Sequence, residues 1–136
     1  MTSFGGLVVF QALIQGLDIK HRLRECVRHL KTSAAYSYSR ILLVLVVHVF
    51  LGWRRLRDLD YYSDDPLVQR VLGLRRLPDV STVSRRLGEF DATAVDNLRG
   101  LQRDLSGTRA CEASPARLTL DFDSLDDPSV LWLRSR

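Results

Sequence analysis

The segment 118–124, LTLDFDS, carries two carboxylates at a spacing that could serve a metal ion. Its apolar residues at 118, 120 and 122 alternate with Thr119, Asp121 and Asp123, which is the period of a strand with one buried face. Asp121 and Asp123 are therefore expected on the same polar face. Because Mg²⁺ prefers carboxylate oxygens together with substrate phosphates, the pattern predicts a strand that presents a metal ligand. A solvated acidic edge of an ordinary strand is the alternative.

The chain around this segment is basic, and its charge is unevenly spread. It has 136 residues, enough for one domain or for a small domain and the start of another. Residues 1–110 hold 17 Lys and Arg against 11 Asp and Glu, a charge of +6, whereas residues 111–136 carry a charge of −2. All the cations except Lys20 and Lys31 are arginines, whose planar fork suits phosphates and base edges. The composition favours a nucleic-acid partner, although a codon-usage bias would also enrich arginine.

Neither the cysteines nor the apolar segments indicate a secreted or membrane protein. Cys26 and Cys111 lie far apart and form no CxxC pair, which argues against a disulfide framework or a zinc site. The N-terminus lacks the cationic start of a signal peptide. The apolar run 41–52 is too short to span a bilayer and is typical of a buried core helix. The expected compartment is the cytoplasm, with no membrane partner.

Hydrophobic periodicity predicts a mainly α-helical chain. An all-apolar helix at 40–51 should form the centre of the core, because amphipathic helices can pack around it. Ser63, two aspartates and Pro66 mark the start of a later helix, and Gly73 marks its end. The segment 106–117, with its Ser, Gly and Pro, is predicted to be a linker before the strand. The predicted helices span residues 7–17, 18–31, 40–51, 53–62, 66–72, 82–90 and 91–105.

The segment 77–87, LPDVSTVSRRL, resembles the start of a recognition helix in helix-turn-helix proteins, where small polar residues precede an arginine pair. In that geometry the N-terminus of the helix faces the major groove of DNA. The helix-turn-helix would span about residues 66–87, with the arginine pair of GLRRLP between its helices. A capped surface helix without a ligand is the alternative. The expected DNA-binding residues are Arg75, Arg76, Ser81, Thr82, Arg85 and Arg86.

Four short motifs follow one another along the chain: DDPL at 64–67, GLRRLP at 73–78, STVSR at 81–85 and LDFDS at 120–124. Together with the opening FGGLVVFQALIQGL, they resemble the N-terminal third of bacterial insertion-sequence transposases of the DDE superfamily. The resemblance covers residues 4–124, nearly the whole chain. It implies DNA as the partner, at the terminal inverted repeats of a mobile element, and it allows a homodimer. A nucleoid-associated location in the cytoplasm is implied as well.

The resemblance also implies a catalytic chemistry for the segment 118–124. In DDE transposases, the first strand of an RNase-H-like α/β domain carries the first acid of an Asp-Asp-Glu triad. Two metal ions, such as Mg²⁺, activate water or a 3′-OH for attack on a DNA phosphodiester. Asp123 is the favoured counterpart, as catalytic acid and metal ligand, because Ser124 follows it as small hydroxyl residues do in the family. Asp121 is the alternative.

Departures from the family pattern set the expected domain organisation. Residues 125–128, LDDP, interrupt the strand, and the second Asp and the Glu of the triad have no counterpart before Arg136. We expect a helical DNA-binding domain over residues 1–105, a linker over 106–117, and a truncated RNase-H-like domain over 118–136, with its first strand and an atypical tail. Such a chain would bind DNA without cleaving or joining it, because a single strand cannot hold the metal ions productively.

Two other classes of function remain open from the sequence. The helices could form a freestanding helix-turn-helix DNA-binding regulator. They could also form a protein-interaction domain whose arginines only keep its surface solvated. A strand-rich domain with a further Asp and Glu, encoded in another reading frame downstream of codon 124, would distinguish the transposase from both alternatives.

Overall fold

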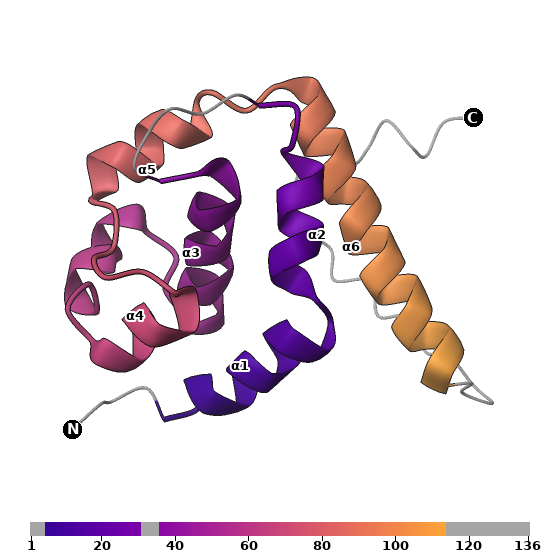
Figure 1. Cartoon of the computed structure of the whole chain (residues 1–136), viewed down its shortest axis with the longest axis horizontal. Coiled ribbons are helices and arrows are strands. Elements are labelled where there is room, and N and C mark those ends of the chain that lie inside the picture. The colour runs from indigo at the N-terminus through magenta and orange to yellow at the C-terminus, as the bar shows by residue number, and fades with distance from the viewer. Residues whose placement is uncertain (1–4, 31–35, 114–136) are drawn as a thin grey trace, which may run out of the picture.

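Helices form all the regular structure in the described part of the chain. The computed structural model describes residues 5–30 and 36–113. The prediction of a mainly α-helical fold is confirmed, and these ranges contain no strand; the predicted strand 118–124 lies outside them. The elements are α1 (Leu7–Gly16), α2 (Ile19–Cys26), α3 (Tyr38–Phe50), the 3₁₀ helix η1 (Leu56–Tyr61), α4 (Pro66–Leu72), α5 (Val80–Leu87) and α6 (Ala92–Ala113) (Figure 1).

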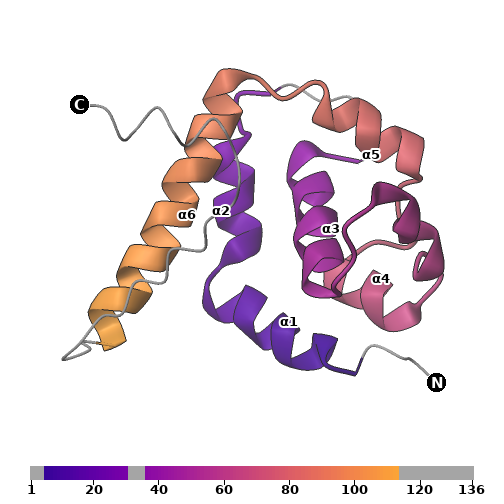
Figure 2. The same cartoon turned by 180° about the vertical axis from the view of Figure 1, so that it is seen from behind.

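Helix α3 lies at the centre of the bundle, as predicted. Figures 1 and 2 show it between α2 on one side and α4 and α5 on the other. Ile41, Val44 and Val47 are fully buried, and the core continues through apolar residues of every other helix. Full burial of one such side chain contributes about 1.5–3 kcal/mol. The packing of α3 is therefore a main source of the stability of the fold.

The C-terminal end of α3 is less enclosed than its apolar sequence suggests. Val49 and Phe50 are exposed, and so are Val8 and Val9 of α1. Phe50 stacks on Phe10 of α1, with the ring centroids 3.8 Å apart. The expectation that α3 is covered on all sides is therefore wrong for its last turn, because α1 covers only part of it.

Helix α2 is shorter than the predicted helix 18–31. It begins after Asp18, which has φ 49°, a left-handed conformation that aspartate adopts more readily than most residues. The helix ends at Cys26. Val27 has φ −115°, outside the helical region, while its side chain remains buried. Burial of this side chain therefore outweighs helical periodicity at the end of α2.

The prediction of a helix over residues 53–62 is wrong for residues 53–55. Gly52 has φ 86°, a conformation that favours glycine, and it ends the helical path of α3. The backbone is extended at Arg55, and a six-residue 3₁₀ helix, η1, follows. The backbone N–H of Trp53 donates to the backbone carbonyl of His48 at 3.2 Å. Contacts with α3 therefore replace the predicted helical turn.

Helices α4 and α5 lie within residues 66–87, where α4 matches its predicted range and α5 spans Val80–Leu87 in place of the predicted 82–90. Asp65 caps α4 by accepting hydrogen bonds from two backbone N–H groups, at 2.8 and 3.1 Å. Gly73 ends α4 with φ 68°. Its N–H and that of Leu74 bond to carbonyls in the last turn, which is the Schellman pattern. Asp79 caps α5, so aspartates and one left-handed glycine fix the ends of this pair.

Helix α6 continues through part of the predicted linker. The sequence predicts a linker from Ser106, but α6 runs to Ala113. Ser and Gly cost at most about 1 kcal/mol each relative to Ala inside a helix, so an otherwise helix-forming segment tolerates them. Residues 106–113 are therefore helical, whereas the sequence predicts a turn-rich connection there. Figure 1 shows α6 beside α2 and extending past it. Within the described ranges, no helix combines the length and the hydropathy needed to cross a membrane.

Candidate nucleic-acid interface

Helix α5 packs one face on the core and exposes the other. Val83 is fully buried, and α5 rests on η1 and α3. Ser81, Ser84 and Arg85 are exposed. Because residues three and four apart lie on the same side of a helix, these three polar side chains form one surface. A recognition helix requires such an exposed polar surface, together with packing on its opposite face that fixes the position of the helix.

Asp79 closes the N-terminus of α5. Its Oδ1 accepts hydrogen bonds from the backbone N–H of Thr82 at 2.7 Å and from the Ser81 hydroxyl at 2.9 Å. The bond from the Thr82 N–H is the main reason why the pKa of Asp79 lies below its ordinary value. A carboxylate at this position already occupies the amide groups and the positive end of the helix dipole. A DNA phosphate is therefore better accommodated beyond the first turn, toward Ser84 and Arg85.

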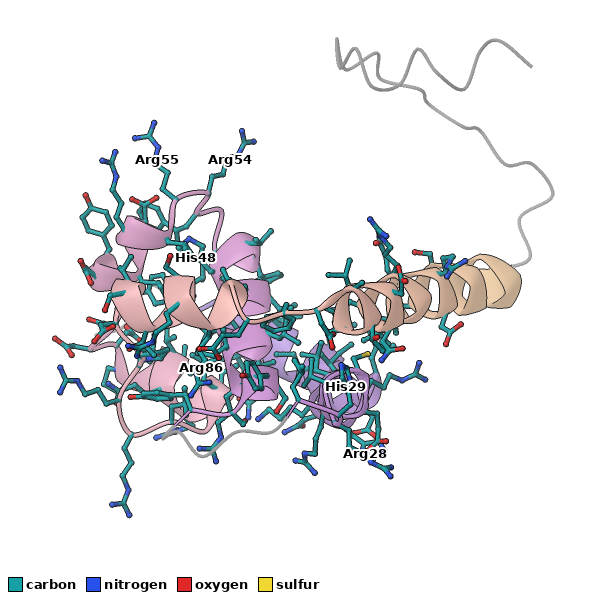
Figure 3. All side chains as sticks on the ribbon, turned by 90° about the horizontal axis from the view of Figure 1, so that it is seen from above. Arg28, His29, His48, Arg54, Arg55 and Arg86 are labelled. Carbon is teal, nitrogen blue, oxygen red and sulfur yellow. The ribbon has the colours of Figure 1, made fainter. Side chains whose placement is uncertain are left out.

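The two adjacent arginines of α5 lie in different surroundings. Arg85 is exposed and forms no ion pair with any residue in the described ranges. The side chain of Arg86 is only 13% exposed, and it donates hydrogen bonds to Glu89 at 2.6 Å and to the Tyr38 hydroxyl at 3.2 Å. Figure 3 shows Arg86 held against the body of the molecule. Two arginines expected to contact DNA together are thus separated, and Arg86 makes internal contacts.

Tyr38 connects the end of α5 to the start of α3. Its hydroxyl donates to Glu89 at 2.7 Å, and its ring meets that of Phe90 edge to face, with centroids 5.6 Å apart. Hydrogen bonds from Tyr38 and then from Arg86 lower the pKa of Glu89. The bond to this carboxylate is also the main cause that raises the pKa of Tyr38. This cluster fixes the orientation of α5 on the core.

The turn between α4 and α5 carries two more exposed arginines, Arg75 and Arg76. The Tyr36 hydroxyl donates to the carbonyl of Arg76 at 3.2 Å, which fixes the backbone of the turn. Arg70 is exposed on α4. None of these three guanidinium groups has an acidic partner among the described residues. Unneutralised positive charge therefore accompanies the helix pair.

Another group of arginines, Arg54, Arg55 and Arg57, received no role in the sequence analysis, which predicts only a helix over residues 53–62. All three are exposed: Arg54 and Arg55 precede η1, and Arg57 lies in its first turn. The η1 helix packs against α5. Figure 3 shows Arg54 and Arg55 projecting on the same side, away from the body. Three arginines within four residues, next to Trp53, were the available sequence signal.

The predicted catalytic acids, Asp121 and Asp123, lie outside the described residues. Within residues 5–30 and 36–113, no group of three His, Cys, Asp or Glu side chains could hold a metal ion. The helical part therefore provides no ligand set for the Mg²⁺ that the resemblance implies, and no role of α5 or its arginines involves one.

The fold and its surface define a small helical protein with unneutralised arginines around one amphipathic helix. A family model described as transposase DDE domain, group 1, matches residues 1–129. The chain belongs to this family of DDE transposases. Neither a curated protein nor a solved structure shows a significant match to it. Family membership favours the transposase over the freestanding regulator and the protein-interaction domain.

Proposed function

We propose that this transposase chain binds the terminal repeats of its mobile element through α4 and α5, with α5 in the major groove. The observation that carries the proposal is the exposed polar face of α5, where Arg85 forms no ion pair with a described residue. Family membership supports the choice of partner, because the function of a transposase implies binding to DNA.

In this proposal, Arg85 contacts a base edge and the turn contacts phosphate. Arginine can donate two hydrogen bonds to O6 and N7 of guanine, a contact worth ~1–3 kcal/mol of discrimination. Ser84 lies on the same face and can donate to a phosphate or a base. Arg75 and Arg76 serve the phosphate backbone, which positions a protein without reading sequence. Arg86 acts indirectly, by holding α5 on Tyr38.

The catalytic chemistry is assigned to a separate segment. DDE transposases depend in general on divalent metal ions. Such ions activate the attacking oxygen and stabilise the negative charge on the leaving oxygen. We assign the first acid of the triad, and a metal ligand, to Asp123, and retain Asp121 as the alternative. Because the helices and this segment have distinct roles, Asp123→Ala should leave DNA binding by the chain unchanged.

Selection from duplexes with a randomised central region tests the proposal. The purified chain should enrich one motif, because base contacts from α5 add sequence preference to the salt-dependent contacts with the backbone. Arg85→Ala should lose the preference at one base pair of that motif, while Asp123→Ala should enrich the same motif as the wild type. A library that remains random after selection by the wild-type chain would contradict sequence-specific binding.

A further inference from the structure

We propose that residues 53–57, here called the arginine loop, bind the phosphate backbone of duplex DNA beside the groove that α5 enters. This inference rests on the proposed function, because it requires that α5 docks on DNA. It adds a contact region that belongs neither to α4 and α5 nor to the turn between them.

The arginine loop carries three positive charges that the rest of the described chain does not neutralise. Arg54, Arg55 and Arg57 are exposed, and none of them forms an ion pair with a described residue. By contrast, Arg28, in the turn after α2, pairs with Glu25 at 3.4 Å. Each DNA phosphate contacted by such a side chain releases counterions, which favours binding at low salt. The loop therefore has the charge that a polyanionic partner requires.

The acids next to the arginine loop do not cancel this charge. Asp58 accepts a hydrogen bond from the backbone N–H of Arg55 at 3.3 Å, so its carboxylate is directed to the backbone. Neither Asp58 nor Asp60 forms an ion pair with an arginine in the described ranges. The guanidinium groups remain available for an external anion.

A buried histidine holds the backbone of the loop. His48 of α3 is only 3% exposed, and its Nε2 lies 3.1 Å from the carbonyl oxygen of Arg55. Since a carbonyl only accepts, Nε2 carries the hydrogen, and Nδ1 accepts from the Tyr62 hydroxyl at 2.5 Å. Burial raises the pKa of Tyr62, so this hydroxyl remains a donor. Together with the bond from the backbone N–H of Trp53 to the backbone carbonyl of His48, this contact fixes the loop to the core at two points.

A backbone fixed in this way reduces the ordering cost of binding, because fewer conformations are lost on contact with a rigid duplex. Tyr61 stacks on Trp53, with centroids 5.2 Å apart, and is itself exposed. A tyrosine hydroxyl is a frequent donor to DNA phosphates. Since η1 begins within the loop, at Leu56, and packs against α5, this basic and aromatic surface adjoins the proposed recognition helix.

The test measures how affinity for a short, fluorescein-labelled duplex of random sequence depends on salt. The loop variant combines Arg54→Gln with Arg57→Gln, and the control combines Arg22→Gln with Arg24→Gln, which removes the same charge from α2. The slope of log K against log salt should fall in magnitude by about 1–2 in the loop variant, at ~0.9 per phosphate contact. The control should keep the wild-type slope. A wild-type slope in the loop variant, or the same reduction in both, would overturn the inference.

The outcomes separate this inference from the proposed function. If Arg85→Ala loses base preference while the loop variant keeps the wild-type slope, α5 docks on DNA without the loop, and only the inference fails. A wild-type chain that binds no duplex even at low salt would overturn both.

Chemical modification of the wild-type protein provides a second test. Because it needs no substitution, a destabilised variant cannot affect the result. Phenylglyoxal reacts with exposed arginines, and mass spectrometry locates the modified sites. The duplex should protect the three arginines of the loop and leave Arg22 and Arg24 as reactive as in the free protein. Equal reactivity of the loop with and without DNA would contradict the proposal.

Discussion

The guanidinium of Arg86 lies over the ring of Tyr38, 5.1 Å from its centroid, and donates a hydrogen bond to the Tyr38 hydroxyl. Arg85, the preceding residue, is exposed. Successive side chains of an α-helix are rotated by about 100°, so two identical neighbours meet the core and the solvent respectively. We therefore expect Arg86 to stabilise the fold and Arg85 to be available for contacts with a ligand.

Arg86→Ala should lower the free energy of unfolding by about 1–3 kcal/mol, because it removes a cation–π contact and hydrogen bonds to groups that remain in place. Arg85→Ala should change it by less than about 0.5 kcal/mol, as is usual for an exposed residue. Thermal unfolding followed by circular dichroism measures both. Equal melting temperatures would contradict this division of roles.

The central position of α3 predicts a large effect of truncating its side chains. Leu43 is 4% exposed, and Leu43→Ala should cost about 2–5 kcal/mol of the free energy of unfolding, through lost burial and the cavity left behind. Leu13 of α1 is 41% exposed, and Leu13→Ala is the matched control with a smaller expected loss. Chemical denaturation gives both values. A loss from Leu43→Ala no larger than the control's would show that α3 is not central.

Adjacent tyrosines provide a matched test of the buried histidine contact. Tyr62→Phe removes the donor to Nδ1 of His48 and leaves that buried nitrogen unpaired, at a cost of about 1–3 kcal/mol. Tyr61→Phe removes the same atom from a side chain that is 73% exposed, and its free energy of unfolding should stay near the wild-type value. The comparison uses urea denaturation. Equal effects of the two substitutions would exclude a stabilising role for the histidine contact.

Acid should destabilise the fold in part through Glu89. Hydrogen bonds from Tyr38 and Arg86 hold the pKa of Glu89 below its ordinary value of 4.5. A carboxylate whose pKa is lowered by folding stabilises the folded state above its unfolded pKa, and this contribution is lost as pH falls through the folded pKa. The melting temperature should therefore fall between about pH 5 and pH 3.

The control for this pH dependence is Glu89→Gln, which removes one of the linked carboxylates. Folding also lowers the pKa values of Asp79 and Asp91, and both residues remain in the variant. The fall in melting temperature should therefore be smaller in Glu89→Gln than in the wild type, without disappearing. The same fall in both proteins would show that Glu89 does not contribute to the acid sensitivity.

Local sequence signals were sufficient to predict a helix boundary where one or two residues determine it. The bounds of α4 follow from Asp65 and Gly73, and the apolar run predicts the position of α3. Local signals failed where distant contacts decide the backbone. The imidazole Nε2–H of His48 bonds to the carbonyl of Arg55 from another element. At Val27 the backbone leaves the helical region although the side chain is buried. Hydrophobic periodicity predicts neither feature.

The candidate site was predictable in part for the same reason. The pattern around residues 77–87 indicated a polar helix, but only the position of Tyr38 distinguishes Arg86 from Arg85. Arg54, Arg55 and Arg57 received no role because the sequence predicts a regular helix over residues 53–62 and does not indicate the loop. Asp121 and Asp123 lie outside the described residues and stay predictions.

The dissociation constant for the motif that the wild-type chain selects tests the DNA-binding role of α5 most directly. Arg85→Ala and Arg24→Ala each remove one exposed arginine that has no ion pair within the described ranges. We predict that Arg85→Ala raises Kd by about 5- to 150-fold, the equivalent of ~1–3 kcal/mol for a lost base contact. Arg24→Ala should change Kd by less than about twofold, because its contribution is limited to screened, long-range attraction. Equal changes in Kd for the two variants would contradict the assignment of α5 as the recognition helix.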